Sequence, residues 1–138
     1  MVGFELHNNI KVTRAISPVS VADNTAAVSQ IIDRANYPGL EFVILLGSIA
    51  DADATFTVLV EDGDASNLSD AAAVADDQLL GTESGASFQY DSDNLTKKIG
   101  YVGSKRYVRL TITPANNASA ALIAAGAIQY GGRVVPIS

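Results

Sequence analysis

The chain has 138 residues and a net charge of −6; 48% of its residues are hydrophobic and 17% are charged. A disordered chain would be less apolar and more charged, so we expect one folded domain with an ordinary hydrophobic core. Cysteine is absent and His7 is the single histidine, which excludes disulfides, cysteine nucleophiles and the usual tetrahedral zinc sites.

Association with a membrane is not expected from the sequence. The longest strictly apolar run, with glycine allowed, covers the nine residues 120–128, whereas a spanning helix needs about 20. The first residues lack the basic region and the apolar core of a signal peptide. We therefore expect a soluble protein with no recognisable export signal and no membrane partner.

Alternation of apolar and polar residues predicts β-strands along most of the chain. The first two strands are expected at residues 10–16 and 28–34. A turn at Pro38 then leads to a strand at residues 40–46. That strand is apolar on both faces after Glu41, so we place it at the centre of the fold.

The clearest alternation lies in residues 55–61 and 107–113. Each segment puts three apolar side chains on one face: Phe56, Val58 and Val60 in the first, and Val108, Leu110 and Ile112 in the second. This one-sided pattern is typical of half-buried antiparallel strands. Pro114 is expected to end the second strand.

Shorter strands are expected at residues 87–90 and 96–102. In residues 69–75 a serine is followed by alanines, which predicts a single helical turn. Residues 118–128 favour a helix by their alanine content, but they follow a strand and a turn, and we predict a strand there.

About seven or eight short strands, spaced by about ten residues, indicate an all-β fold: an antiparallel β-sandwich, a jelly roll or a small barrel. We divide the chain into an N-terminal arm or edge strand, residues 1–20, and a single β-sandwich domain, residues 21–138.

Charge is distributed unevenly along the chain. Residues 35–93 hold twelve acidic residues and no lysine or arginine, whereas residues 94–138 hold six basic residues and no acid. Either the two segments interleave in the fold and neutralise each other, or they form faces of opposite sign that suit association. Six bases beside twelve acids do not form a stripe that follows a phosphate backbone, so no nucleic acid partner is expected.

One loop begins like a calcium site. Asp62, Asp64 and Ser66 have the spacing of the first calcium ligands, but Asn67 and Ala73 stand where an EF-hand requires glycine and glutamate. We expect an acidic loop in solvent and no metal.

A catalytic centre is not evident either. His7 lies near the N-terminus without a nucleophile-presenting turn, and the paired carboxylates lie in polar stretches. Glycine-rich nucleotide-binding motifs are absent. We therefore expect a protein that is not an enzyme, has no cofactor and acts by binding or as a building part.

Several segments resemble known small virion proteins. Residues 97–114 carry this resemblance most clearly, together with residues 29–33, residues 51–62 and the alanine-rich strand that runs to Arg133. They look like parts of proteins encoded among the head genes of tailed bacteriophages. The chain is similar to a capsid cement, or decoration, protein with a jelly-roll fold, of the kind described for a Bordetella phage.

This resemblance implies a non-enzymatic structural protein of the virion, made in the cytoplasm of the bacterial host. It would bind the outside of an icosahedral phage head and bridge neighbouring major capsid subunits, which stabilises the shell. The implied partners are the major capsid protein and the chain itself, as a homodimer or trimer. Candidate interface residues are Phe4, Leu6, Ile10, Val12, Arg14, Lys105, Arg106 and Arg109.

The alternative is a carbohydrate- or receptor-binding jelly-roll module on a phage tail or fibre. Sites of that kind usually have aromatic residues on loops beside acidic residues, and the candidates here are Tyr37, Tyr90 and Tyr101.

Overall fold

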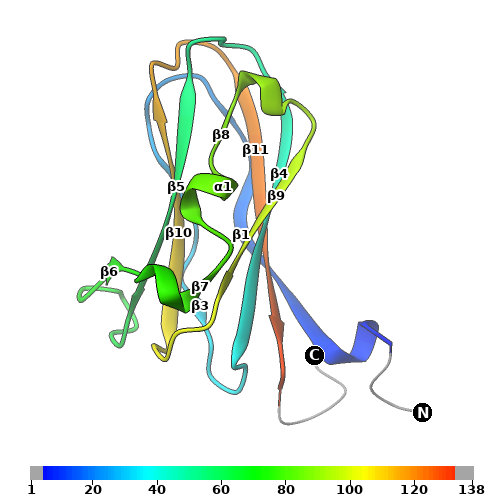
Figure 1. Ribbon diagram of the computed structural model, residues 1–138, viewed down its shortest axis with the longest axis vertical. Coiled ribbons are helices and arrows are strands. Elements are labelled where there is room, and N and C mark those ends of the chain that lie inside the picture. The colour runs from blue at the N-terminus through cyan, green and yellow to red at the C-terminus, as the bar shows by residue number, and fades with distance from the viewer. Residues whose placement is uncertain (1–4, 133–138) are drawn as a thin grey trace.

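Two antiparallel sheets pack face to face, with one short helix and three 3-10 turns at the rims (Figure 1). The computed structural model describes residues 5–132 of the chain. The elements are η1 (His7–Asn9), β1 (Ile10–Val21), β2 (Ala27–Val28), β3 (Ile32–Asp33), β4 (Gly39–Ile49), β5 (Thr55–Gly63), β6 (Ala72–Ala73), η2 (Asp76–Gln78), β7 (Leu79–Leu80), α1 (Glu83–Ala86), β8 (Phe88–Gln89), η3 (Tyr90–Ser92), β9 (Thr96–Tyr101), β10 (Tyr107–Ala115) and β11 (Ala121–Tyr130).

The first sheet, here called sheet A, has the strand order β1-β11-β4-β9-β7. The second, sheet B, has the order β2-β10-β5-β6, and β3 and β8 pair with β10 and β5. The all-β prediction and the antiparallel jelly-roll sandwich are confirmed. The central placement of the strand at 40–46 is confirmed too, because β4 is the middle strand of sheet A.

The core lies between the sheets and is built from the inward rows of both. Phe42, Ile44 and Leu40 of β4 are fully buried, and they face Val60 of β5 and Leu110 of β10 from the other sheet. Each row follows from the period-two pattern of its strand, since alternate side chains point to one face. Burial of these rows is the main term that holds the sandwich together.

Side chains close much of the open edge of β5. Next to β8 and β6, which pair with its two ends, the Val58 N–H donates to Ser87 Oγ at 3.0 Å and the Val60 N–H donates to Glu83 Oε2 at 2.7 Å. Glu83 lies in α1 and Ser87 is its C-cap residue, so the helix stands where a further strand would otherwise pair. Such covering protects a sheet edge from pairing with other chains.

The predicted helical turn at 69–75 is wrong. This segment holds β6, whose two alanines pair with Glu61 and Asp62 of β5. The α-helix forms further along, at α1, where the Thr82 side chain accepts the Gly85 N–H as an N-cap. The two alanines pair with the otherwise free edge of β5, and this tertiary contact overrides their helix propensity.

Two strand predictions also differ from the structure. Residues 28–34 form two short strands, β2 and β3, rather than one. β10 continues through Pro114 to Ala115. Because β2 pairs no further than Ile112, a proline without an N–H is tolerated where one neighbouring strand has ended. The strand predicted in the alanine-rich segment is confirmed as β11.

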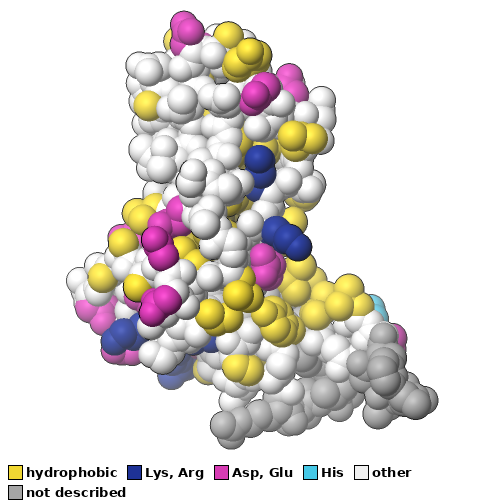
Figure 2. All heavy atoms as spheres, in the orientation of Figure 1, with side chains coloured by type: hydrophobic (Ala, Val, Ile, Leu, Met, Phe, Trp, Pro, Cys, Tyr) yellow, Lys and Arg dark blue, Asp and Glu magenta, His cyan; other side chains and the backbone are white. Residues whose placement is uncertain are grey.

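The two outer faces differ in character. Sheet B presents threonines, among them the exposed Thr55, Thr57 and Thr113. Sheet A presents apolar side chains, such as Leu45 at 52% and Leu122 at 45% exposure. Figure 2 shows hydrophobic side chains gathered over the lower half of the molecule toward the grey terminal residues. No helix among residues 5–132 is long and apolar enough to cross a membrane.

The edge of β5 gives a test of this fold. Glu83→Ala removes the acceptor of the Val60 N–H beside the core, and we expect it to lower the free energy of unfolding by about 1–3 kcal/mol. Ser84→Ala, on an exposed neighbour in the same helix, should change it by less than about 0.5 kcal/mol. Urea denaturation of both variants measures the difference; equal effects would show that the helix does not close the edge.

Candidate functional site

The candidate interface residues of the N-terminal arm lie along the edge of sheet A. Ile10, Val12 and Arg14 pair with Tyr130, Ile128 and Gly126 of β11, so their side chains share the outer face of the sheet. Val12 and the preceding Leu6 are each 68% exposed. Phe4, the remaining candidate of the arm, lies outside the described residues. The arm is thus, over residues 10–20, an edge strand of its own sandwich.

The outer backbone edge of β1 is covered along one half of the strand and open along the other half. Beyond Arg14 its register shifts twice, it carries Pro18, and the Gln30 N–H donates to the Ala15 carbonyl at 3.0 Å. Bulges, proline and a covering segment all discourage strand addition. Residues 10–13, in contrast, have no hydrogen-bonded backbone neighbour on the side away from β11 within residues 5–132. This half presents a template for an added strand.

The three candidate cations at 105–109 are all paired within the chain. Lys105 Nζ lies 2.7 Å from Asp64, Arg106 Nε lies 2.9 Å from Asp33, and Arg109 contacts Glu61 at 2.9 Å. Two of these pairs join the acidic segment 35–93 to the basic segment 94–138, which therefore interleave. Arg109 and Glu61 lie directly opposite each other on β10 and β5, on the outer face of sheet B. They are thus on the opposite side of the sandwich from Val12 and Arg14.

These contacts shift the pKa values of the partners in the directions expected for ion pairs. The Arg106 guanidinium lowers the pKa of the Asp33 carboxyl. The Asp64 carboxylate raises the pKa of Lys105. Both pairs are exposed to solvent, so each contributes little to stability. The charges of Lys105 and Arg106 are therefore largely neutralised by partners within the same chain.

The loop that carries Lys105 is held by an arginine and a tyrosine. Arg34 lies with its guanidinium 4.6 Å from the centre of the Tyr101 ring and donates to the carbonyl oxygens of Gly103 at 2.7 Å and Lys105 at 2.8 Å. The Tyr101 hydroxyl donates to Asp62 at 2.6 Å and accepts the Lys105 N–H at 3.0 Å. We call Arg34, Asp62 and Tyr101 the loop clamp. It fixes the 102–105 loop in one conformation.

Burial has a marked effect on the clamp tyrosine. Tyr101 is fully buried, and this burial, together with its hydrogen bond to Asp62, raises its pKa from 10.0 to about 12. A buried phenol beside a carboxylate resists ionisation because the anion would be poorly solvated and repelled. The hydroxyl therefore stays a donor over the whole neutral range.

The loop that begins like a calcium site is occupied by internal contacts. Asp62 is buried in the clamp, Asp64 is paired with Lys105, and Asp70 accepts the N–H groups of Asp64 and Ala65. In residues 5–132 there is no group of three or more acidic or histidine side chains placed to hold a metal ion. The sequence prediction treated Asp62 as a solvated loop residue, and this was wrong because its carboxylate receives the Tyr101 hydroxyl.

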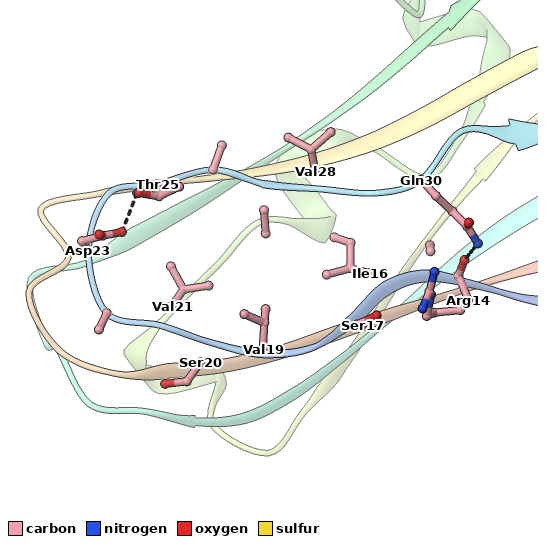
Figure 3. Close-up of a pocket in the computed structure, with 14 residues that line it drawn as sticks. Arg14, Ile16, Ser17, Val19, Ser20, Val21, Asp23, Thr25, Val28 and Gln30 are labelled. Atoms are coloured by element: carbon pink, nitrogen blue, oxygen red, sulfur yellow. Dashed lines mark hydrogen bonds between the residues drawn. The ribbon is translucent and has the colours of Figure 1, made fainter. Parts of the chain in front are cut away.

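A groove of about 660 Å³ runs between β1 and the segment 22–30. Figure 3 shows Ile16, Val19 and Val21 pointing into it, with the Arg14–Gln30 contact at one end and Asp23 with Thr25 at the other. Its lining includes no aromatic residue. It lacks the flat ring faces on which a sugar would stack.

The tyrosines considered for carbohydrate binding are not brought together. Tyr101 is buried in the clamp, and Tyr37 is half-buried beneath the Lys11 ammonium, 5.7 Å from its ring centre. Tyr90 is 49% exposed, but it lies in η3, which contacts the end of β4 opposite to the end that pairs with Tyr101.

The sequence analysis missed two features. One is the clamp, whose signal was weak because Arg34 and Asp62 are far apart in sequence. The other is the apolar outer face of sheet A. Its signal was present, since residues 40–46 are apolar on both faces, although only one face of a sandwich strand reaches the core.

Neither a family model nor a curated protein matches the sequence. Among solved structures, the PBSX exported protein XepA is similar with a TM-score of 0.57 and 11% identity, over 94% of this chain and 39% of its own. A structure of the CBM22-1 and GH10 modules of Clostridium thermocellum xylanase Xyn10B, complexed with xylohexaose, gives a TM-score of 0.54 and 14% identity over 94% and 26%. The SPBc2 prophage-derived protein YomS gives 0.49 and 8% over 88% and 93%.

This chain thus spans 39% and 26% of the length of the first two proteins. At such identities the likeness shows the jelly-roll sandwich fold alone.

The clamp predicts a pH dependence. At pH values below 10 Tyr101 is protonated in both the folded and the unfolded chain, so its contribution to stability is complete. Between pH 10 and about 12 the unfolded chain ionises while the folded chain does not, so stability falls as the pH rises. Unfolding curves across this range should fall more steeply for the wild type than for Tyr101→Phe; parallel curves would contradict the raised pKa.

The geometry of the clamp also predicts that lysine cannot replace Arg34. Arg34→Lys loses the planar fork and the stacking on Tyr101, and we expect a loss of about 2 kcal/mol in the free energy of unfolding. Arg106→Lys, in an exposed pair, should cost less than about 0.5 kcal/mol. Thermal and urea unfolding compare the two; a similar loss in both variants would argue against the clamp.

Proposed function

We propose that this chain is a cement protein of a tailed-bacteriophage capsid, which binds the outside of the icosahedral head and bridges major capsid subunits. The observation that carries the proposal is the open half of β1, residues 10–13, in a sandwich whose other half of β1 and whose β5 edge are covered. Natural proteins normally blunt such edges, so an open one with an exposed apolar side chain marks a docking position.

Strand addition supplies the contact that a cement protein needs. A shell segment that pairs with residues 10–13 would gain main-chain hydrogen bonds, and Val12 would give a side-chain contact beside them. A protein that engages two shell subunits makes its second contact intramolecularly, so many modest contacts give strong overall binding. In this proposal the chain lies on the outside of the particle.

The rest of the molecule supports this role by its rigidity. The sandwich is closed by long ladders, such as the nine paired residues of β10 and β5, and the clamp fixes the 102–105 loop. Residues 97–114, which carry most of the resemblance to phage cement proteins, form β9, this loop and most of β10. In this proposal Lys105, Arg106 and Arg109 remain paired with carboxylates of their own chain, and β1 makes the contact.

The test uses shells that lack the protein. Addition of the purified chain should raise the temperature at which such shells rupture, since bridging subunits resist internal pressure. Light scattering during heating measures this temperature, and co-sedimentation measures binding. Shells that neither bind the chain nor change their rupture temperature at saturating concentration would refute the cement role.

Two matched valine variants separate the edge from the face of sheet A. Val12 lies on the edge strand and Val43 at the centre of the same outer face. A charge at an edge discourages strand addition, so Val12→Lys should weaken shell binding by about tenfold or more, and Val43→Lys should weaken it less. A larger loss in Val43→Lys would place the shell contact on the face instead.

A further inference from the structure

The outer face of sheet A is an apolar surface with few charges. Its outward residues, which we call face A, are Ile10, Val12 and Arg14 of β1, Leu122, Ala124, Gly126, Ile128 and Tyr130 of β11, Glu41, Val43, Leu45 and Gly47 of β4, Thr96, Lys98 and Gly100 of β9, and Leu80 of β7. Charged groups are few there, at Arg14, Glu41 and Lys98. An antiparallel sheet in water normally alternates apolar inward and polar outward residues, and sheet B does so.

The exposed apolar area of face A is a large part of what a protein interface needs. Val12, Leu45, Leu80, Leu122 and Tyr130 are between 37% and 68% exposed. With about 200 Å² for a fully exposed large side chain, they offer about 500 Å², before Ile10, Val43 and Ile128 are added. A standard interface buries about 800 Å² on each partner. The largest apolar patch of a small protein is often a functional surface.

The charges on face A are arranged so that the face complements itself. Neither Arg14 nor Glu41 belongs to an ion pair within residues 5–132. The two residues are separated by two strand spacings across the sheet and by two residues along the strands, so their Cα atoms are about 12 Å apart. The midpoint between them falls on β11, between Gly126 and Ile128.

A two-fold axis through that midpoint, lying in the plane of contact and perpendicular to the line from Arg14 to Glu41, exchanges the two positions. Each Arg14 then stands opposite the Glu41 of the other copy, which is the reciprocal pattern of an isologous interface. Lys98 lies further toward β7, nearer the rim of the contact.

The centre of face A is shaped for close approach. A Cβ atom added to Gly126 would meet nothing nearer than the Thr13 carbonyl oxygen at 3.8 Å, so the strand is bare at the axis. Ala124 is the next outward residue of β11, and Leu122 beyond it lies over Gly47. Because Gly126 has no side chain and Ala124 has only a methyl group, the face beside Val43, Leu45 and Ile128 has room for side chains of a second copy.

We propose that face A is the surface on which a second copy of this chain docks, as a two-fold symmetric dimer in which Arg14 of each copy pairs with Glu41 of the other. This assignment does not depend on the capsid role. It uses side chains across the whole face, whereas the shell contact uses the backbone edge of β1, and Val12 is the residue that belongs to both. A dimer of this kind presents two β1 edges, which is the valence that bridging requires.

The partial burial of Glu41 independently supports its proposed pairing with Arg14 of a second copy. Burial raises the pKa of its carboxyl, and the Lys98 charge lowers it only in part. A carboxylate in apolar surroundings is strongly stabilised by an arginine of a partner chain, because the guanidinium forms directed hydrogen bonds with the carboxylate oxygens.

Analytical ultracentrifugation of the full chain tests the proposal. We expect a dimer with a Kd on the order of 1 µM or tighter. Arg14→Glu and Glu41→Arg each place like charges opposite each other and should weaken the dimer by about tenfold or more. The double variant R14E/E41R restores the pairing in reverse and should return the Kd to within about threefold of the wild type.

Thr57→Glu is the matched control, since it adds a carboxylate to the outer face of sheet B and should leave the Kd unchanged. Removal of residues 133–138 should also leave the dimer intact. A chain that stays monomeric at high concentration would overturn the proposal, as would a dimer that is indifferent to both single reversals. A monomer that dimerises only after removal of residues 133–138 would show instead that its own C-terminal segment covers face A. Shell binding measured on the same variants reports on the cement role separately.

Discussion

An antiparallel sandwich satisfies the backbone of its inner strands but leaves rows of donors and acceptors at each edge. How each edge is covered or left open determines where the other elements of this molecule lie and which surface can bind a partner. At β5 the free N–H groups of Val58 and Val60 are taken by Ser87 and Glu83, which explains why a short helix is placed there. At β1 the second half is bulged and covered, whereas residues 10–13 have no backbone partner on the outer side among residues 5–132. The proposed function follows from that difference.

The uneven distribution of charge along the sequence has a simple outcome in three dimensions. The acidic β5 lies beside the basic β10, so Glu61 and Arg109 become neighbours, and Lys105 reaches Asp64. Pairing of two strands thus cancels charges that stand dozens of residues apart. On face A, Arg14 and Glu41 form no ion pair with any other residue in the described range 5–132, and these two charges carry the inference of a dimer.

The fold was largely predictable because its strands obey a local rule. Alternation identified β5 and β10, and the strand–turn context identified β11 in spite of its alanines. What failed depends on distant partners. The alanines of β6 become extended because β5 has a free edge, and Asp62 is buried because Tyr101 lies 39 residues further along the chain. The candidate residues of β1 were chosen from the N-terminal arm and its apolar side chains, and their role in an interface stays a prediction. No local signal showed that Lys105, Arg106 and Arg109 would be paired within the chain.

The first and last described strands are direct neighbours, with Ile10 beside Tyr130, so the start of β1 and the end of β11 lie at the same end of the sandwich (Figure 1). Tension applied between the two ends would therefore peel β1 from β11 one bond at a time, which is the weakest way to load a ladder. Tension transmitted along the length of β1 from its side loads many bonds together. A particle that is stretched from within is better held by the flank of this strand than by its tips.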